Sequence, residues 1–296
     1  MMPTQFDRIY EVQIGTTIIK TADLRFKATR TLRAKPNTCS INIYNLSEPT
    51  RGAIAESKHT VVQIKAGYRG LPTRSEALAA VDEALGTGAQ DGAQAGVIFR
   101  GDVREVSSTY MPPDWETYVE GGDGERQIRT ARINKSYAKG TSVEVIMRDM
   151  AKAMKVNLGN AAKRALASGS LEGAGKEFLN GVTVSGSAYR EMEAIVRSAG
   201  KELSVQNGNL QILDRGQALR DVSVILTPDT GLIGSPTVND KGIVSIRALM
   251  NPAIVPGRQL ELRSRSVTGR LRAIRCDYVG DTEGEDWYVD VEAKAL

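Results

Sequence analysis

The most regular spacing of apolar positions lies between residues 187 and 199. Apolar residues recur there at the intervals that place side chains on one face of a helix, namely Ala188, Met192, Ile195, Val196 and Ala199. Ser187 suits the N-cap of this helix, because a serine side chain accepts a hydrogen bond from a backbone N–H of the first turn. Gly200 suits the C-terminal end of this helix, because glycine readily adopts the left-handed conformation that ends many helices. The spacing predicts an amphipathic helix between these two residues.

A hairpin is predicted directly after this helix. The pair Asn207-Gly208 separates two alternating runs and favours a two-residue type I′ turn, because both residues tolerate a positive φ. Such a turn determines which residues face one another across the two strands. The expected pairs are Leu203 with Ile212, Val205 with Leu210, and Ser204 with Gln211. We therefore expect one apolar face, covered by the helix, and one polar face.

Short alternating runs, typical of strands, occupy most of the chain on both sides of this unit. Before it they lie at 10–19, 24–28, 39–44, 60–68, 97–106 and 115–119, and after it at 223–226, 242–249, 259–263, 271–278 and 287–293. Turns are expected at 121–125, 227–231 and 234–236, and helices at 50–55 and 141–154. The fold class predicted is mainly β (β+α), with two small β-barrels and an intervening α/β part of helices and a hairpin.

Three domains follow from this pattern. Residues 1–135 form an N-terminal β-barrel, residues 136–220 an α/β middle domain, and residues 221–296 a C-terminal β-barrel. Residues 71–96 interrupt the first barrel with a segment whose second half is rich in Gly, Ala and Gln. We interpret this segment as a surface insertion, because the β pattern resumes at once after it, although a linker between domains is the alternative. Its end offers little to bury, so residues 86–96 are expected to be mobile and dispensable for folding.

Composition narrows the class of protein. The chain has 296 residues, 41% hydrophobic residues, 5% aromatic residues and a net charge of only +4, which does not indicate a specific nucleic-acid binder. Its two cysteines, Cys39 and Cys276, match no metal-ligand spacing and are expected to be free, buried thiols. The start of the chain lacks the pattern of a secretory signal, and no apolar run is long enough to cross a bilayer. We therefore expect synthesis and folding in a cytoplasm.

Few residues suggest catalysis. His59 is the single histidine, which argues against Ser-His and Cys-His nucleophiles and against a histidine zinc site. The glycines at 121–124 lack the Lys-Ser/Thr of a phosphate loop, and the acidic segment 281–286 lacks the ligand spacing of an EF-hand. Asp123 and Glu125 could form the acid pair of a glycosidase, but an exposed hairpin tip is the more natural interpretation. We predict no catalytic, cofactor-binding or metal-binding residues.

Several segments occur in an order that resembles a known family. They lie at 97–103, 122–125, 133–137, 140–141, 204–213, 227–236, 280–281 and 286–288. In order and spacing the chain resembles a bacteriophage baseplate hub of the Mu-like, contractile-tail kind, which is related in fold to the base of type VI secretion spikes. The resemblance implies a homotrimer whose six barrels form a ring that joins the tail tube to the central spike, and it implies no catalysis. It also implies that the tail tube protein, the central spike protein and other baseplate proteins are partners, with the protein located in the virion tail baseplate.

Two other functions stay open at this point. A tail-associated cell-wall hydrolase would need a cleft that holds an acid pair, and a nucleic-acid-binding module would need a dominant basic face.

Protein interfaces of the permanent kind are enriched in aromatic residues and arginine. Arginines are concentrated near the C-terminus, either on solvated strand faces or at an interface, and they comprise Arg258, Arg263, Arg265, Arg270, Arg272 and Arg275. The residues predicted to form a protein interface are Trp287, Tyr288, Arg263, Arg265, Arg270 and Arg272.

Overall fold

The computed structural model describes residues 8–32, 36–58, 60–68, 95–123, 130–169, 171, 181–219 and 223–296. His59, Glu125 and all but the last two residues of the predicted insertion at 71–96 lie outside the described residues. Of those last two, Gly96 begins strand β6.

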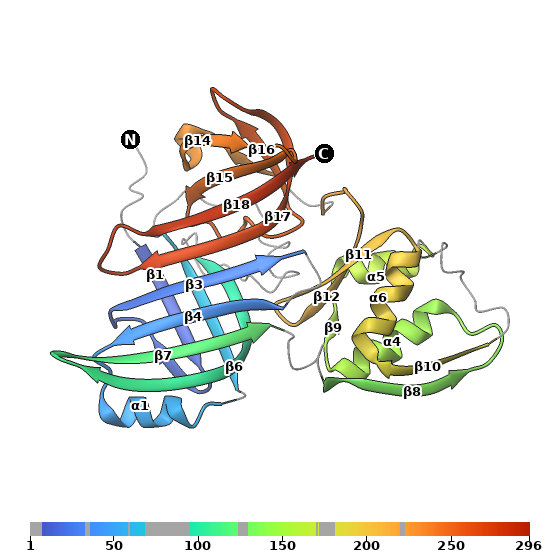
Figure 1. Ribbon diagram of the computed structural model, residues 1–296, viewed down its shortest axis with the longest axis horizontal. Helices are drawn as coiled ribbons and strands as arrows, with labels where there is room; N and C mark the ends of the chain where they lie inside the picture. Colours follow the sequence, from blue (N-terminus) through green and yellow to red (C-terminus); the bar gives the residue numbers. More distant parts are fainter. Residues whose placement is uncertain are drawn as a thin grey trace.

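A single sheet of 13 strands, mostly antiparallel, forms the larger part of the molecule (Figure 1). Its N-terminal strands are β1 (Arg8–Ile14), β2 (Thr17–Ile19), β3 (Leu24–Thr31), β4 (Asn37–Tyr44), β5 (Val61–Tyr68), β6 (Gly96–Met111) and β7 (Asp114–Asp123). Its C-terminal strands are β13 (Val224–Leu226), β14 (Leu232–Val238), β15 (Ile243–Leu249), β16 (Gln259–Arg263), β17 (Thr268–Asp281) and β18 (Trp287–Ala295). The strand order is β14-β15-β18-β17-β3-β4-β7-β6-β5-β1-β2, with β16 also on β17 and β13 on β16.

Strand β17 joins the two β regions. Its first residues pair with β16 and its last residues pair with β3, on either side of a register shift between Ala273 and Arg275. One buried apolar cluster accordingly contains residues of both regions, from Val12 to Ala293. The mainly β fold with an α/β part is confirmed. The strand pairs of the described residues, however, close neither region into a separate barrel, because β17 continues the hydrogen-bonded ladder of one region into the other.

Residues between the two β regions in sequence form a smaller α/β part beside the sheet (Figure 1). Its elements are β8 (Arg132–Tyr137), α4 (Val143–Met154), β9 (Asn157–Leu158), α5 (Asn160–Ala167), β10 (Val182–Ser187), α6 (Ala188–Ser198), β11 (Lys201–Gln206) and β12 (Asn209–Asp214). Strand β8 pairs with β10, and β11, β12 and β9 form a second small sheet. Its own buried cluster includes apolar side chains of α4, α6 and both hairpin strands.

The predicted helix and hairpin are confirmed. The side chain of Ser187 caps α6, and Gly200 follows the helix with a φ of +71°. Strands β11 and β12 pair in the predicted register. Asn207 and Gly208 have φ angles of +52° and +76°, as a type I′ turn requires.

Two predicted turns are parts of strands instead. Residues 234–236 belong to β14, which accommodates its Gly and Pro through a register shift between Ile233 and Thr237. Gly121, Gly122 and Asp123 end β7. A Cβ at Gly121 would lie 2.5 Å from the Val62 side chain, so glycine is needed here for close packing of strands rather than for a turn.

The turn geometry leads to a first prediction. Replacing Asn207 and Gly208 together by alanine should lower the free energy of unfolding by about 1–3 kcal/mol, the usual cost of strained backbone positions. Chemical denaturation of the variant and the native chain measures this difference. Gly52→Ala is the control, because an added Cβ there meets no atom within 4 Å and alanine favours a helix. Equal stability of the double variant and the native chain would contradict a type I′ turn that depends on these residues.

Candidate functional site

The tip of the β11–β12 hairpin inserts against the large sheet at the end of β7. There the carboxylate of Asp123 accepts hydrogen bonds from the backbone N–H groups of Asn207 (2.6 Å) and Gly208 (2.9 Å). The side-chain amide of Asn37 donates to the same carboxylate at 3.2 Å. Burial raises the pKa of Asp123, although these donors and the nearby Arg30 favour its charged form.

Arg30 and Gln206 extend this polar contact. The Nε of Arg30 donates to Oε1 of Gln206 at 3.2 Å, and Nε2 of Gln206 donates to the backbone oxygen of Thr31 at 2.8 Å. Asn37 also donates to Oε1 of Gln206. We name Arg30, Asn37, Asp123 and Gln206 the junction cluster. All four are almost fully buried, and their directional bonds fix how the α/β part is oriented on the sheet.

The junction cluster adds to one sequence prediction and corrects another. The predicted polar face of the hairpin, which carries Ser204 and Gln211, is buried. Asp123 is not at an exposed hairpin tip, and both of its oxygens are occupied by backbone and amide donors. A carboxylate in this position cannot reach a sugar substrate, so the acid pair proposed with Glu125 is not supported. The only sequence signal for the buried polar contact of the junction cluster was the position of Gln206, which alternates with the apolar residues of its strand.

The residues predicted to form an interface lie in different environments. Trp287 is 2% exposed, packs edge-on against Phe26 with ring centroids 5.5 Å apart, and donates from Nε1 to the oxygen of Gly67. Arg272 is also buried and pairs with Glu202 at 2.6 Å. These two side chains therefore stabilise the chain itself.

The other four predicted residues reach the surface. Tyr288 is half-buried beneath Arg247, whose guanidinium lies 3.9 Å from the ring centroid. Arg263 is exposed and pairs with Glu261 on the same strand. Arg265 and Arg270 are exposed as well. Their role at an interface stays a prediction.

The backbone of the acidic loop at the end of β17 is hydrogen-bonded to an arginine side chain. Nη1 of Arg8 donates to the backbone oxygens of Asp281 (2.9 Å) and Gly284 (2.5 Å), and Nη2 donates to that of Glu285 (3.2 Å). These carbonyl oxygens, which a calcium loop would direct at the ion, are thus bound by a guanidinium. Among the described residues there is no group of three or more His, Cys, Asp or Glu side chains that could hold a metal ion.

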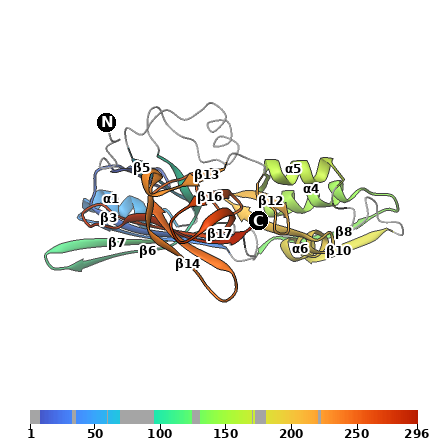
Figure 2. The same cartoon turned by 90° about the horizontal axis from the view of Figure 1, so that it is seen from above.

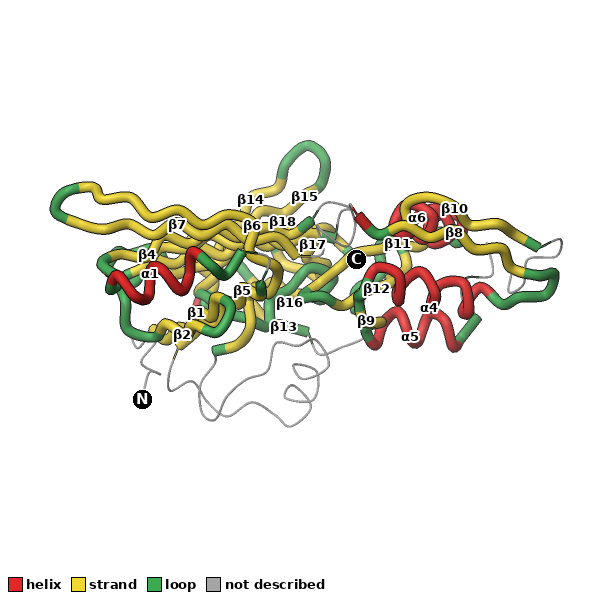
Figure 3. The backbone as a smooth tube through the Cα atoms, turned by 90° about the horizontal axis from the view of Figure 1, so that it is seen from below, coloured by secondary structure: helices red, strands yellow, loops and turns green. Residues whose placement is uncertain are grey.

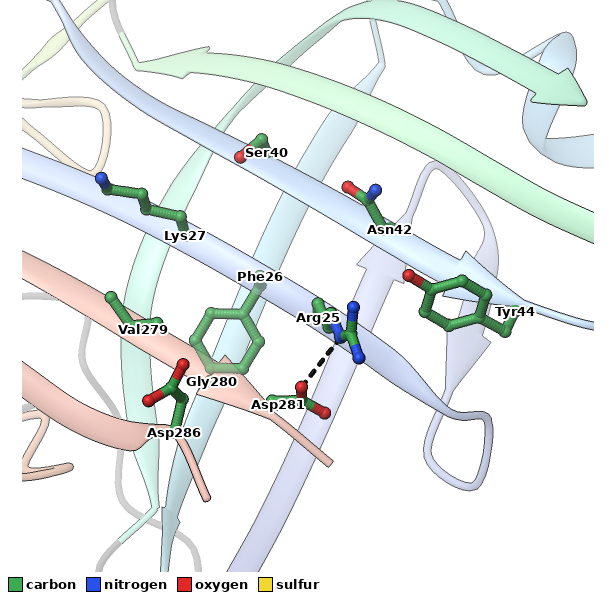
Figure 4. A pocket seen from close by; sticks show the side chains of 10 residues that line it. All are labelled: Arg25, Phe26, Lys27, Ser40, Asn42, Tyr44, Val279, Gly280, Asp281 and Asp286. Carbon is green, nitrogen blue, oxygen red and sulfur yellow. Dashed lines mark hydrogen bonds and ion pairs between the residues drawn. The ribbon is translucent and has the colours of Figure 1, made fainter. Parts of the chain in front are cut away.

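A polar hollow of about 270 Å³ lies on the outer face of β3, β4 and β17 (Figure 4). Arg25 and Asp281 form an ion pair of 2.8 Å at its side, and Lys27 and Asp286 also line it. Ser40, Asn42 and Tyr44 complete its polar wall. Charges of both signs and short polar groups suit a side chain of a protein partner.

Two long hairpins project from the sheet in different directions (Figures 2 and 3). One is formed by β6 and β7, and the other by β14 and β15. The tip of the first carries exposed Tyr110, Met111 and Trp115, and the second carries exposed Ile233 and Val238 on an edge strand. Exposed apolar side chains on projecting elements are typical of protein interfaces.

No helix among the described residues has both the length and the apolar character needed to cross a membrane.

The buried thiols lead to a second prediction. Cys39 and Cys276 are free and buried, as the sequence predicted, and burial raises the pKa of Cys276 to about 12. Neither thiol should react with a thiol reagent at pH 8 within the minutes that an exposed thiol needs, because the thiolate is the reactive form. Both should react once the chain is unfolded in guanidinium, which is the control. Rapid labelling of the folded chain would contradict the burial.

Solved structures with the same fold include two tail proteins and a chain of the PdpA–VgrG complex. The 43 kDa tail protein of prophage MuSo2 from Shewanella oneidensis has a TM-score of 0.62 at 10% identity, over 98% of this chain and 97% of that chain. The tail protein from Neisseria meningitidis MC58 has a TM-score of 0.60 at 7% identity, with the same coverage. A chain of the Francisella PdpA–VgrG complex has a TM-score of 0.58 at 7% identity, and the match covers 99% of this chain but 59% of that one.

At these low identities the likeness shows a shared fold. The family model described as baseplate hub gp41 matches residues 10–268, and the chain belongs to this family. The resemblance to Mu-like baseplate hubs that the sequence suggested is confirmed. Family membership places the protein in the baseplate of the virion tail. No curated protein is significantly similar to the chain in sequence.

Proposed function

We propose that this baseplate hub protein acts as a trimeric adaptor that joins the tail tube to the central spike. In each chain, residues 1–135 and 221–296 supply the two β regions, and residues 136–220 supply the α/β part. Three chains around one axis would place six β regions in a ring. Such a ring could meet a six-fold tube on one side and a three-fold spike on the other.

The observation that carries this proposal is the pairing of β17 with β3. This ladder extends from Arg275–Thr31 to Asp281–Arg25 and joins the two β regions through backbone hydrogen bonds. A shared core of buried side chains, including Tyr278 and Trp287, adds to it. A chain built in this way transmits load between its two β regions without a flexible linker, which suits a part that connects a tube to a spike.

The likeness to a chain of the PdpA–VgrG complex supports a role in assembly with another protein, because that chain is part of a complex. The likeness to two tail proteins, one of them from a prophage, supports a role within the tail itself. Other baseplate proteins are therefore the partners we propose. We further propose that the chain has no catalytic activity of its own, since the one acid pair that suggested hydrolysis contains the buried Asp123.

Co-expression with the tail tube and spike proteins of the same gene cluster tests this function. The expected result is that an affinity-tagged hub retains both partners and that the complex contains three hub chains by mass. The hub should not release fragments from purified cell walls. Retention of neither partner would overturn the adaptor role. Lysis that is lost in Asp123→Asn would support a hydrolase instead.

A further inference from the structure

Two surfaces of the chain are complementary to one another but lie on different sides of it. We name the tip of the β6–β7 hairpin, with exposed Tyr110, Met111 and Trp115, the arm tip. We name the free edge of β14, with Ile233 on one face of the strand and Val238 on the other, together with the neighbouring β16–β17 turn and its arginines the edge patch; the arginines are Arg263, Arg265 and Arg270. In Figures 2 and 3 the arm tip and the β14–β15 hairpin point in different directions.

The arm tip is aromatic and acidic. Tyr110 and Trp115 face each other across the hairpin with ring centroids 5.3 Å apart, and Met111 is 59% exposed at the turn. The hairpin between residues 104 and 120 carries four acidic residues and one arginine. One further cation, Arg51 of α1 (Glu48–Ala55), stacks on Trp115 at 4.1 Å and holds the ring in place.

The edge patch is aliphatic and basic. Within the described residues β14 has one strand partner, β15, so its other edge presents unpaired backbone groups beside Ile233 and Val238. The β16–β17 turn lies against this strand, because Ser266 donates to the oxygen of Pro236 at 3.3 Å. Residues 259–270 carry three arginines and one glutamate, so this segment of the chain has a net positive charge.

Two of these arginines form no ion pair within the part of the chain that the structure describes. Among the described residues, Arg263 pairs with Glu261, whereas no acidic group lies within ion-pair distance of Arg265 or Arg270. A surface that combines exposed aliphatic groups with unpaired cations fits an apolar surface rimmed by carboxylates. The arm tip is such a surface, and every copy of the chain carries both.

We infer that the arm tip of one copy docks on the edge patch of the next copy. The two surfaces differ, so the contact is heterologous, and a heterologous contact repeated around an axis closes into a ring. This inference rests on the proposed trimer and assigns the contact between its subunits. The arm tip would lie along the free edge of β14 between Ile233 and Val238, and Asp114 and Glu116 would lie near Arg265 and Arg270.

A mixing experiment tests the contact. Met111→Asp damages the arm tip and leaves the edge patch intact, whereas Val238→Asp does the reverse. Both side chains are exposed in the single chain, so neither substitution should prevent it from folding. The native chain should sediment as a particle of three chains of 32.0 kDa, and each variant alone as a monomer. An equimolar mixture should give dimers and no trimers, since a mixed pair retains one intact contact and a ring needs three.

Disulfide trapping tests the position of the contact. Met111→Cys mixed with Val238→Cys should form a covalent dimer on mild oxidation, and neither variant should do so alone. The native thiols are buried and should not interfere. Ile18→Cys in place of Val238→Cys is the matched control, because Ile18 is equally exposed but lies on β2 at the other end of the sheet.

Each outcome decides a separate question. A native chain that stays monomeric at high concentration, or a mixture of the two aspartate variants without dimers, would overturn the docking contact. Variants that remain trimeric would overturn it too, while leaving the proposed adaptor intact. Trapped dimers from a hub that retains neither tube nor spike protein would support the contact and reject the adaptor role.

Discussion

Trp287→Ala is expected to lower the free energy of unfolding by about 3–5 kcal/mol, the range measured when large buried aromatic residues are truncated. The indole is 2% exposed and lies between the two β regions. It packs against Phe26 of β3 and donates to Gly67 of β5, although it belongs to β18. Its removal would leave a cavity and an unpaired carbonyl at the place where the two regions share their core. Urea denaturation followed by circular dichroism measures the loss.

The matched control is Trp115→Ala. This second tryptophan is 37% exposed at the arm tip, so its truncation should change the free energy of unfolding by less than about 1 kcal/mol. If the docking contact is correct, Trp115→Ala should weaken self-association instead. If Trp287→Ala were as stable as the native chain but assembled more weakly, Trp287 would be an interface residue, as the sequence suggested.

Asp123→Ala is the second large expected effect, with a loss of about 2–5 kcal/mol. The substitution leaves the backbone N–H groups of Asn207 and Gly208 and the amide of Asn37 without their acceptor in a buried site. The α/β part would lose its fixed orientation on the sheet as well as stability. Denaturation together with small-angle scattering measures both changes. Asp240→Ala, in the exposed tip of the β14–β15 hairpin, is the control and should be neutral.

The pH dependence of Asp123 has a definite sign. Burial raises its pKa above the ordinary value of 3.8, so the folded chain binds this proton more tightly than the unfolded chain does. The stability linked to this proton is fully present below the unfolded pKa and is lost as the pH rises through the folded pKa. The native chain should therefore gain stability relative to Asp123→Asn as the pH is lowered from neutrality toward 3.8. A relative loss over that interval would contradict the direction of the shift.

Local sequence patterns were sufficient to predict the helix α6 and the hairpin that follows it. The cap at Ser187, the stop at Gly200 and the turn at Asn207-Gly208 depend on backbone preferences of a few neighbouring residues. The alternation of side chains then allowed only one register for β11 and β12. The order of segments was also sufficient to identify the hub family, because this order can be read from the sequence without knowledge of tertiary contacts.

The environment of Asp123 could not be predicted in the same way. Glycines followed by an acid favour an exposed turn when only neighbours in sequence are considered. In the fold, Gly121 is needed because the side chains of Val62 and Cys39 leave no room for a Cβ, and Asp123 meets a hairpin more than 80 residues further along the chain. Such a contact depends on how two separate cores pack.

The sequence by itself determined the mainly β composition, the α/β unit and its turn, the buried thiols and the family. Each of these follows from residue spacing over a few turns or strands. Only the tertiary structure decided that Trp287 is a core residue, that the two β regions share β17, and that the arm tip and the edge patch are left uncovered. Alternation specifies that one face of a strand is apolar, but it does not specify what covers that face. The partner of a face is set by packing between distant segments, and for the arm tip and the edge patch we propose that it is the next copy of the chain.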